Sequence, residues 1–499
     1  MTSTESHNRQ YRRRSYLKHC LVGLGATLSA TGVAAADDPE AQYDTVVDVV
    51  EAGADPEGNE SITPVLREHA GDDTLFEFPD GRYYMDEQFR LTGFENVGFV
   101  GEDATLVPAN YHEFDGPQYR LFRLGTSDNP GRNLRFEGFD VDQAAPDTGI
   151  RVISAQVEDG LVVKRVTVRG VHDSGTWGPG LFNITDSDGR GVVDCFRAAD
   201  GGRHVDETPN EGNMWRGPTG ITIDQNHRGT LVFSNCALGG FPDNGLYASG
   251  ENGRVSVDGG RFWNSGTASI RLSGTSGEIR DAVVVVDENP HDSAGQHPIR
   301  LDHGDRFDVE GVTIDVPQPN GDAIRIMNGV DATTISNAEI SVGDRPNNGI
   351  KIDAGAGQTF VKDVDIEIDG SANAVQILGS DAGEVALQDV RITGDAPGTT
   401  MRHAIYCERD GCRFDGLSIE QQGSNERRGL ELRGEDYRVA DSEFETTHTP
   451  LVVNGADDVR IEGCVARSEE DGYSLHIIDD SGAVSLTNNE FPDGVRDDR

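Results

Sequence analysis

The chain has 499 residues and a formal net charge of −44, with 87 acidic against 43 basic side chains. A surface this acidic argues against nucleic acid and anionic membranes as partners, because both repel negative charge. Apolar residues nevertheless recur with strand periodicity along the chain, which excludes an acidic disordered polypeptide.

The first 36 residues predict an export signal. Residues 13–18 (RRSYLK) resemble the twin-arginine motif, an apolar run too short to span a bilayer follows, and Ala34-Ala35-Ala36 forms a cleavage site. We therefore expect an extracellular protein, a monomer that folds before export and does not insert into membranes. Only four basic residues are lysines, and this lysine-poor, acidic composition resembles that of haloarchaeal proteins, whose molar salt shortens the Debye length to about 3 Å.

Residues 37–73 predict an opening segment with a short helix. Ile62, Val65, Leu66 and His69 have the spacing of one helical face, and Ser61 precedes them as a possible N-cap. A helix here would cover the first coil of the repeat described next, whose edge would otherwise be open.

A short phrase recurs every 21–40 residues in the segment 74–491: a small residue, an aliphatic, a variable residue and usually a second aliphatic. A polar turn and another alternating run follow each phrase, with no helical stretch between them. The phrase begins at Gly149, Gly180, Gly220, Gly245, Ser269, Pro298, Ala323, Gly349, Ala374, Ala404, Gly429, Pro450 and Ser474. This pattern predicts an all-β, right-handed parallel β-helix of about 13–16 coils, followed by a tail at 492–499.

Other repeat architectures fit less well. A leucine-rich repeat needs a Leu/Asn pattern and a helical return, a propeller needs antiparallel blades, and a left-handed β-helix needs strict hexapeptides. Residues 75–83 and 97–106 resemble the opening coils of the pectin lyase-like superfamily, in which a strand ends in a Pro-x-Gly turn and a glycine-containing strand follows. That resemblance implies a fold that hosts many chemistries, often on polysaccharides bound along one strand face.

The third position of the phrase should point outward, and its residues should form a column across the coils. The column reads Arg151, Phe182, Thr222, Tyr247, Arg271, Arg300, Arg325, Lys351, Gln376, Tyr406, Glu431, Val452 and His476. The column contains four consecutive cations, which is unusual for so acidic a protein. We call them the basic row (Arg271, Arg300, Arg325 and Lys351).

Two interpretations of the basic row remain open. Asp302 and Asp353 follow on the same strands, so the row can be a solvated face held by ion pairs. Alternatively, the row binds an acidic polysaccharide: arginine forks hold carboxylates, Tyr247 and Tyr406 stack on sugars, and Asp302 and Asp353 coordinate Ca²⁺.

Two insertions, 171–219 and 287–297, carry His, Trp and acidic residues that suggest functional loops. Residues 289–292 (NPHD), which include His291, resemble the Asp-Pro-His-Asp motif of alginate C5-epimerases, with Asn in the first position. A Gly-His-Gly turn of the polygalacturonase type is absent from the sequence, which excludes that class.

These patterns predict a lyase or epimerase acting on a uronate-containing glycan. Arg300, His297 or His303 would remove the proton next to the carboxylate, while Arg271, Arg325, Lys351 or Ca²⁺ would neutralise that carboxylate and His291 would contact the sugar. The alternatives are a non-catalytic glycan-binding or matrix protein and a structural β-helix with a partner interface.

Five cysteines follow the predicted cleavage site. Cys407 and Cys412 are close enough in sequence to bridge neighbouring strands, whereas Cys236 and Cys464 replace core residues of other coils and are expected to be buried thiols.

Overall fold

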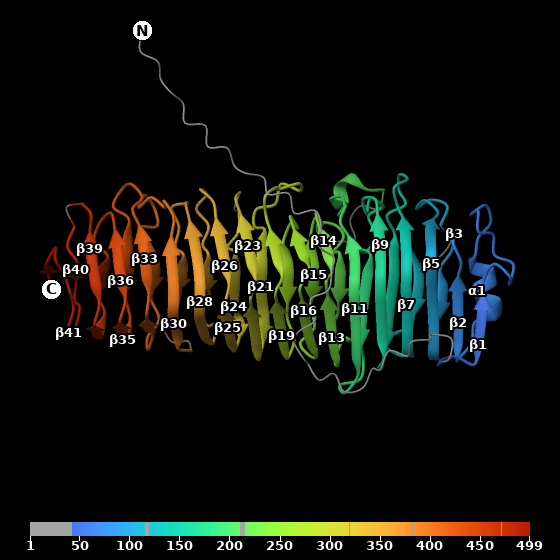
Figure 1. The fold of residues 1–499 in the computed structure, drawn as a ribbon, viewed down its shortest axis with the longest axis horizontal. Coiled ribbons are helices and arrows are strands. Elements are labelled where there is room, and N and C mark those ends of the chain that lie inside the picture. The colour runs from blue at the N-terminus through green and yellow to red at the C-terminus, as the bar shows by residue number, and fades with distance from the viewer. Residues whose placement is uncertain (1–41, 115–118, 210–214, 319, 381–382, 471) are drawn as a thin grey trace, which may run out of the picture. The chain divides into compact units, whose positions relative to one another are not determined.

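The alternating runs fold as parallel strands that pack one coil on the next (Figure 1). The structure is a computed structural model that describes residues 42–499, except 115–118, 210–214, 319, 381–382 and 471. The predicted export signal therefore lies outside the described residues. Tyr43–Arg499 form one unit.

The recurring phrase forms a 16-stranded parallel sheet. Its strands, in chain order, are β4 (Phe89–Leu91), β6 (Arg120–Leu124), β8 (Arg151–Val157), β10 (Gly180–Ile184), β12 (Ile221–Ile223), β15 (Asn244–Ala248), β18 (Ala268–Leu272), β21 (His297–Gly304), β24 (Ile324–Val330), β27 (Ile350–Ile352), β29 (Val375–Ile377), β31 (His403–Cys407), β34 (Arg428–Leu432), β37 (Leu451–Asn454), β40 (Leu475–Ile478) and β42 (Val495–Asp497).

The return path of each coil forms a 26-stranded parallel sheet. Its strands are β1 (Thr45–Asp48), β2 (Thr74–Phe78), β3 (Gly81–Met85), β5 (Glu95–Pro108), β7 (Arg132–Asp142), β9 (Leu161–Arg169), β11 (Arg190–Ala198), β13 (Thr230–Ser234), β14 (Ala237–Gly239), β16 (Arg254–Asp258), β17 (Arg261–Trp263), β19 (Ser276–Arg280), β20 (Val283–Val285), β22 (Arg306–Glu310), β23 (Thr313–Val316), β25 (Ala332–Ser336), β26 (Glu339–Val342), β28 (Gln358–Ile368), β30 (Val385–Thr393), β32 (Arg413–Asp415), β33 (Ser418–Gln421), β35 (Glu435–Ala440), β36 (Glu443–Thr446), β38 (Asp457–Glu462), β39 (Val465–Ser468) and β41 (Val484–Thr487).

The predicted fold class is confirmed: the chain is a right-handed parallel β-solenoid of about 17 turns. Inward positions of both sheets carry Val, Ile, Leu and Phe, which form one continuous core along the stack. Cys236 and Cys464 belong to this core as free thiols, as expected. Cys407 and Cys412 are also buried and free, so the bridge between them that the sequence allowed is not formed in this structure.

Each return path bends at one residue in the left-handed region, which lets the chain turn a corner without a loop. Short polar side chains tolerate this conformation, and Asn or Asp occupies most of these corners. The corner residues with positive φ include Asn235, Asp281, Asn337, Asp363, Asp389, Asp441 and Asn488, with Gly259, Gly311, Gly416 and Gly463 in the same column. This column keeps successive coils in register, and the strands of the 16-stranded sheet stay aligned as a result.

The two ends of the solenoid differ from the sequence-based expectation in detail. Helix α1 (Thr63–His69) is present, but its N-cap is Ile62 without a side-chain hydrogen bond, so the predicted cap at Ser61 is wrong. At the other end, β42 pairs in parallel with β40 and extends the β-helix past residue 491, because Val495 continues the inward column of Leu475.

A 3-10 helix, η2, spans Val205–Glu207. No helix in the described part is long and apolar enough to span a membrane.

Candidate functional site

The outward column of the 16-stranded sheet is longer than the phrase alignment indicated. Strand register places its members side by side in the order Arg90, Arg123, Ser154, Leu181, Thr222, Tyr247, Arg271, Arg300, Arg325, Lys351, Gln376, Tyr406, Glu431, Val452, His476 and Arg496. Two expected members are therefore wrong. Phe182 is buried and its neighbour Leu181 takes the outward place, while Arg151 pairs with Arg120 and lies three residues before the column residue Ser154. The phrase is offset from the strand register by three residues at Arg151 and by one residue, in the opposite direction, at Phe182.

The basic row forms as predicted, with Arg271, Arg300, Arg325 and Lys351 in adjacent register. Its arginines, however, form ion pairs with carboxylates of the same sheet. Arg271 and Arg300 both pair with Asp302, each at 2.6 Å, and Arg325 pairs with Asp353 at 3.1 Å. This arrangement is the ion-paired face that the sequence left open as the structural interpretation.

The three predicted histidines lie near the row but are engaged with backbone or turned away from solvent. His297 is 7% exposed and its Nδ1 donates to the carbonyl oxygen of Asp322, and burial lowers its pKa. The Nε2 of His303 is buried without a partner in the described part. His291 hydrogen-bonds through Nε2 to the carbonyl oxygen of Gly240 at 2.8 Å. Their catalytic and binding roles remain predictions.

The calcium assignment also remains a prediction. Asp302 and Asp353 each already accept hydrogen bonds from arginine, and they face different arginines rather than one another. The described residues contain no group of three or more His, Cys, Asp or Glu that could hold a metal ion. Tyr406 donates its hydroxyl proton to Glu408 at 2.6 Å and carries the Arg433 guanidinium 5.4 Å from its ring centre.

A pocket of about 470 Å³ opens on the same face, upstream of the row. We call it the arginine pocket. Its lining residues are Arg120, Arg123, Arg151, Ser154, Gln156, Trp177, Leu181, Thr219, Thr222, Asp224, Gln225, Asp243, Tyr247 and Ser249. The volume falls in the range of small-ligand sites. Tyr247 connects the two regions, because it lines the pocket and stacks 4.4 Å from the guanidinium carbon of Arg271.

The three arginines of the pocket have no acidic partner among the residues that the structure describes. Arg151 is 3% exposed and Arg120 is 8% exposed, yet neither forms an ion pair with a described carboxylate. Each arginine also keeps a buried nitrogen without a hydrogen bond: Nε in Arg120 and Arg123, and Nη2 in Arg151. Buried charges are normally paired, so this cluster is an unsatisfied donor set.

The electrostatics of the cluster follow from its burial. Desolvation, together with the charge of Arg120, lowers the pKa of Arg151 to about 9. Desolvation and the charges of Arg123 and Arg90 lower the pKa of Arg120 to about 10. His172, which lies nearby, has a pKa lowered to about 3 by burial and by the charge of Arg151, so it stays neutral at any working pH. The cluster is therefore cationic at neutral pH. The nearby Asp224 carboxylate partly opposes the lowering of the Arg151 pKa but forms no ion pair with it.

The first insertion builds one wall of the pocket. Arg151 donates from Nε to the carbonyl oxygen of Gly178 at 2.9 Å, and Trp177 lies 5.9 Å from its guanidinium carbon. A Cβ atom on Gly178 would overlap the carbonyl oxygen of Thr219, so only glycine allows this close approach. Trp177 is 51% exposed, which leaves its ring available to a ligand.

A stack of small polar side chains holds this wall in place. Ser174 donates to the carbonyl oxygen of Gly149 at 2.5 Å and contacts the hydroxyl of Thr176 at 3.0 Å. Asp173 accepts hydrogen bonds from the backbone N–H groups of Asp147 and Gly149. The loop that carries Trp177 is thus tied to the strand that carries Arg151.

Two carboxylates line the opposite side of the pocket. Asp224 accepts from Asn183 Nδ2 and from the backbone N–H of Asn226, both at 2.8 Å. Asp243 accepts from the Thr219 hydroxyl at 3.0 Å. Their existing hydrogen bonds hold them in place, and they present acceptors to the hydroxyl groups of a ligand whose anionic group binds to the arginines.

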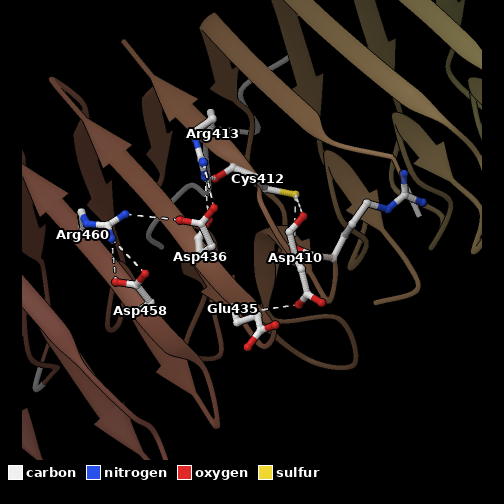
Figure 2. A network of polar contacts seen from close by, with 8 residues as sticks. Asp410, Cys412, Arg413, Glu435, Asp436, Asp458 and Arg460 are labelled. Atoms are coloured by element: carbon white, nitrogen blue, oxygen red, sulfur yellow. Dashed lines mark hydrogen bonds and ion pairs between the residues drawn. The ribbon is translucent and has the colours of Figure 1, made fainter. Parts of the chain in front are cut away.

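Surface arginines elsewhere show the ordinary arrangement. On the 26-stranded sheet, Asp436 pairs with Arg413 at 2.9 Å and with Arg460 at 3.3 Å, and Arg460 also pairs with Asp458 (Figure 2). The arginine pocket departs from this pattern, which is why we regard it as the candidate functional site.

Part of this site could be predicted from the sequence, but two of its three arginines were not. The sequence placed Arg151, Tyr247 and Thr222 in one column and Trp177 in the insertion, but the column did not include Arg120 or Arg123. The signal was present: Arg120–Leu124 reads as an upstream copy of the phrase, with Phe122 and Leu124 inward and Arg123 outward. The second insertion, 287–297, supplies no residue to the pocket lining.

Comparison with known proteins finds similar solved structures but no family. No family model matches the chain, and no curated protein matches it. The solved structures that resemble it include the ORF18 protein of Geobacillus virus E2 (10% identity, TM-score 0.35), the catalytic unit of a GH87 alpha-1,3-glucanase from Streptomyces thermodiastaticus (14%, 0.39) and the surface adhesin PfbA of Streptococcus pneumoniae (13%, 0.40).

The similar segments are long. They cover 75%, 90% and 91% of this chain, and 61%, 69% and 100% of the three matched chains, respectively. The chain thus spans about three fifths of the viral protein that it resembles. At these identities and TM-scores the likeness carries no argument about function, which must be argued from the pocket.

Proposed function

We propose that this protein binds an acidic glycan, with a carboxylate of the sugar chain in the arginine pocket. The observation that carries the proposal is the set of buried nitrogen atoms on Arg120, Arg123 and Arg151 that lack partners in the described part. A uronate carboxylate is planar and accepts from two guanidinium nitrogens at once, which matches the geometry of arginine better than a spherical anion does.

The rest of the pocket suits a sugar. Trp177 offers an exposed ring face, and Tyr247 offers a second aromatic group at the boundary with the basic row. Asp224 and Asp243 offer acceptors for hydroxyl groups. The twin-arginine segment supports export, which would bring the pocket to extracellular polysaccharides.

The net charge of the chain does not oppose this ligand in the way it opposes nucleic acid. At molar salt, long-range repulsion is screened within about 3 Å, whereas bidentate hydrogen bonds and stacking act at contact. Recognition would then depend on the local geometry of the pocket rather than on the field of the whole surface.

The direct test is calorimetric titration of the full chain with short oligouronates and with neutral oligosaccharides of the same length, in high salt. We expect binding of the uronates and loss of that binding in Arg120→Gln. The matched control is Arg300→Gln, which removes an arginine of the same sheet that is already paired with Asp302. Equal affinity of the wild type for uronate and neutral sugars would contradict the proposal.

A second candidate is cleavage of the glycan by β-elimination, and the lowered pKa of Arg151 favours it. An arginine with a pKa of about 9 is neutral often enough to remove the proton next to the carboxylate, while the still charged Arg120 and Arg123 stabilise the enolate that forms. The sequence offered Arg300, His297 or His303 as this base. Arg300 is held by Asp302 and His297 is buried, so the pocket offers the better position.

Product analysis separates the two candidates. A lyase releases an unsaturated uronate that absorbs in the ultraviolet, and its rate should rise with pH toward about 9 and be lost in Arg151→Gln. Binding without any product leaves the glycan-binding function, and a reducing end without ultraviolet absorbance would indicate hydrolysis, with Asp224 and Asp243 as the acids to test.

A further inference from the structure

Cys407 and Cys412 lie on the two sides of one corner, where the chain passes from β31 toward β32. Their Sγ atoms are 3.6 Å apart, and both side chains are fully buried. A disulfide bond is about 2.0 Å long, so a shift of about 1.5 Å would join the two sulfur atoms. The remaining described cysteines, Cys195, Cys236 and Cys464, have no contact with another cysteine sulfur.

Arg409 occupies the same corner and ties it to earlier coils. Its guanidinium group is fully buried and donates to five carbonyl oxygens, including those of Ala356 and Leu378 at 2.9 Å each. It forms no ion pair with a described carboxylate. Its own carbonyl oxygen lies 3.2 Å from Cys412 Sγ and 3.6 Å from Cys407 Sγ, so this anchored residue holds both thiols in place.

Ordinary burial of two small apolar residues does not account for this arrangement. Cys407 does sit in an inward column between Ile377 and Leu432, where an aliphatic residue would serve the core. Cys236 and Cys464 show that ordinary role, since each is buried and neither forms a hydrogen bond with another sulfur atom; Cys195 lies close enough to Cys236 to raise its pKa. Among the described cysteines, a hydrogen bond between two sulfur atoms occurs only at this corner. Although burial opposes it, the hydrogen bond from Cys412 and the Arg409 charge lower the pKa of Cys407, which favours the thiolate that starts disulfide exchange, whereas the pKa of Cys412 is raised by that hydrogen bond and by burial.

We propose that Cys407 and Cys412 are a redox site that forms an intrachain disulfide by exchange with a small-molecule disulfide such as oxidised glutathione. One cysteine thiolate attacks a sulfur of the small disulfide, whose S–S bond breaks and releases one thiol. The second cysteine thiolate then attacks the mixed disulfide and releases the second thiol. The protein loses two protons and two electrons, and one disulfide is reduced to two thiols.

The bond would close a turn of the solenoid around Arg409 without touching the arginine pocket. A short covalent loop restricts the unfolded chain, so the oxidised protein should unfold at a higher temperature than the reduced one. Glycan binding should be the same in both states, which makes this inference independent of the proposed function.

Peptide mapping tests the proposal directly, because trypsin cleaves after Arg402, Arg409 and Arg413. The full chain is incubated with oxidised glutathione, alkylated, denatured and digested. We expect the peptides 403–409 and 410–413 to appear joined, about 2 Da lighter than the sum of the two, and to separate on reduction. Recovery of both peptides with alkylated thiols, or with glutathione attached to both, would overturn the proposal.

Two variants complete the test. Cys236→Ala/Cys464→Ala removes two other buried thiols and should still give the joined peptide. In the wild type, oxidation should raise the thermal midpoint, and in Cys412→Ala it should not. An equal rise in Cys412→Ala would show that another thiol is responsible. If this variant does not fold, the peptide maps of the wild type and of the double variant still show whether Cys407 and Cys412 are joined.

Discussion

The arginine pocket and the basic row lie on the same sheet, contain the same residue type and are separated by a single tyrosine, yet they differ in their counter-charges. In the row, Asp302 accepts from two arginines and Asp353 from a third. In the pocket, Arg120 and Arg151 are buried and Arg123 is partly exposed, and none of the three forms an ion pair with a described carboxylate. A column of cations is thus a weak indicator of a ligand site, whereas a buried cation without a partner is a strong one.

The largest expected effect comes from removing an arginine of the pocket. Arg151→Gln should weaken oligouronate binding about a hundredfold or more, because the carboxylate loses a charged bidentate donor in a desolvated site. Arg325→Gln in the row should change affinity less than about threefold. Calorimetric titration of both variants measures the difference, and equal losses would remove the distinction between the two regions.

Removing the carboxylate that two arginines of the basic row share should leave those arginines without an ion pair, as in the arginine pocket. Asp302→Ala leaves Arg271 and Arg300 adjacent and unpaired, which should cost about 1–3 kcal/mol in the free energy of unfolding. The same variant should gain a second, weaker site for oligouronates, visible as a stoichiometry above that of the wild type. Asp458→Ala, which removes an exposed carboxylate on the other sheet, is the control and should change neither quantity measurably. A stable Asp302→Ala variant without added binding would show that free arginines alone do not make a site.

The pH dependence of binding should also separate the two regions. Arginine binds a carboxylate only in its protonated form, which exists below its pKa. Burial lowers the pKa values of Arg151 and Arg120 to about 9 and about 10, so affinity in the pocket should be constant near neutral pH and fall as the pH rises through that window. Titrations between pH 7 and 10.5 would show this fall, and an affinity that is unchanged at the upper end would contradict it.

The smallest effect is expected from the aromatic wall. Trp177→Ala removes a half-exposed ring that stacks beside Arg151 and should weaken binding about fivefold to tenfold, with little change in thermal stability. Phe360→Ala removes a similarly exposed ring from the other sheet and should leave affinity unchanged. A Trp177→Ala variant with wild-type affinity would exclude stacking as part of recognition.

The fold could be predicted from the sequence because its determinants are local and repeated. The alternation of inward aliphatic residues from Gly220 to Ser474 gives nearly every strand of the 16-stranded sheet its register, and the basic row followed directly from that alignment. The prediction failed where the period changed. At Arg151 and Phe182 the repeated phrase is out of step with the strand register, so the two residues lie outside the expected column.

The candidate site could be predicted only in part for a second reason. Whether an arginine is paired depends on side-chain contacts between coils about 25–30 residues apart, as in the pair between Arg271 and Asp302. The alignment offered Asp302 as a partner for Arg300 but did not show that it serves both arginines. It also gave no reason to compare Arg120 with Arg151, which become neighbours only through the pairing of β6 with β8.

The most direct test of the central claim is a crystal structure of the full chain saturated with a short oligouronate. The account predicts electron density for a sugar beside Trp177, with carboxylate oxygens within hydrogen-bonding distance of Arg120 and Arg151. Density along the basic row between Arg271 and Lys351, with no ligand in the arginine pocket, would contradict it.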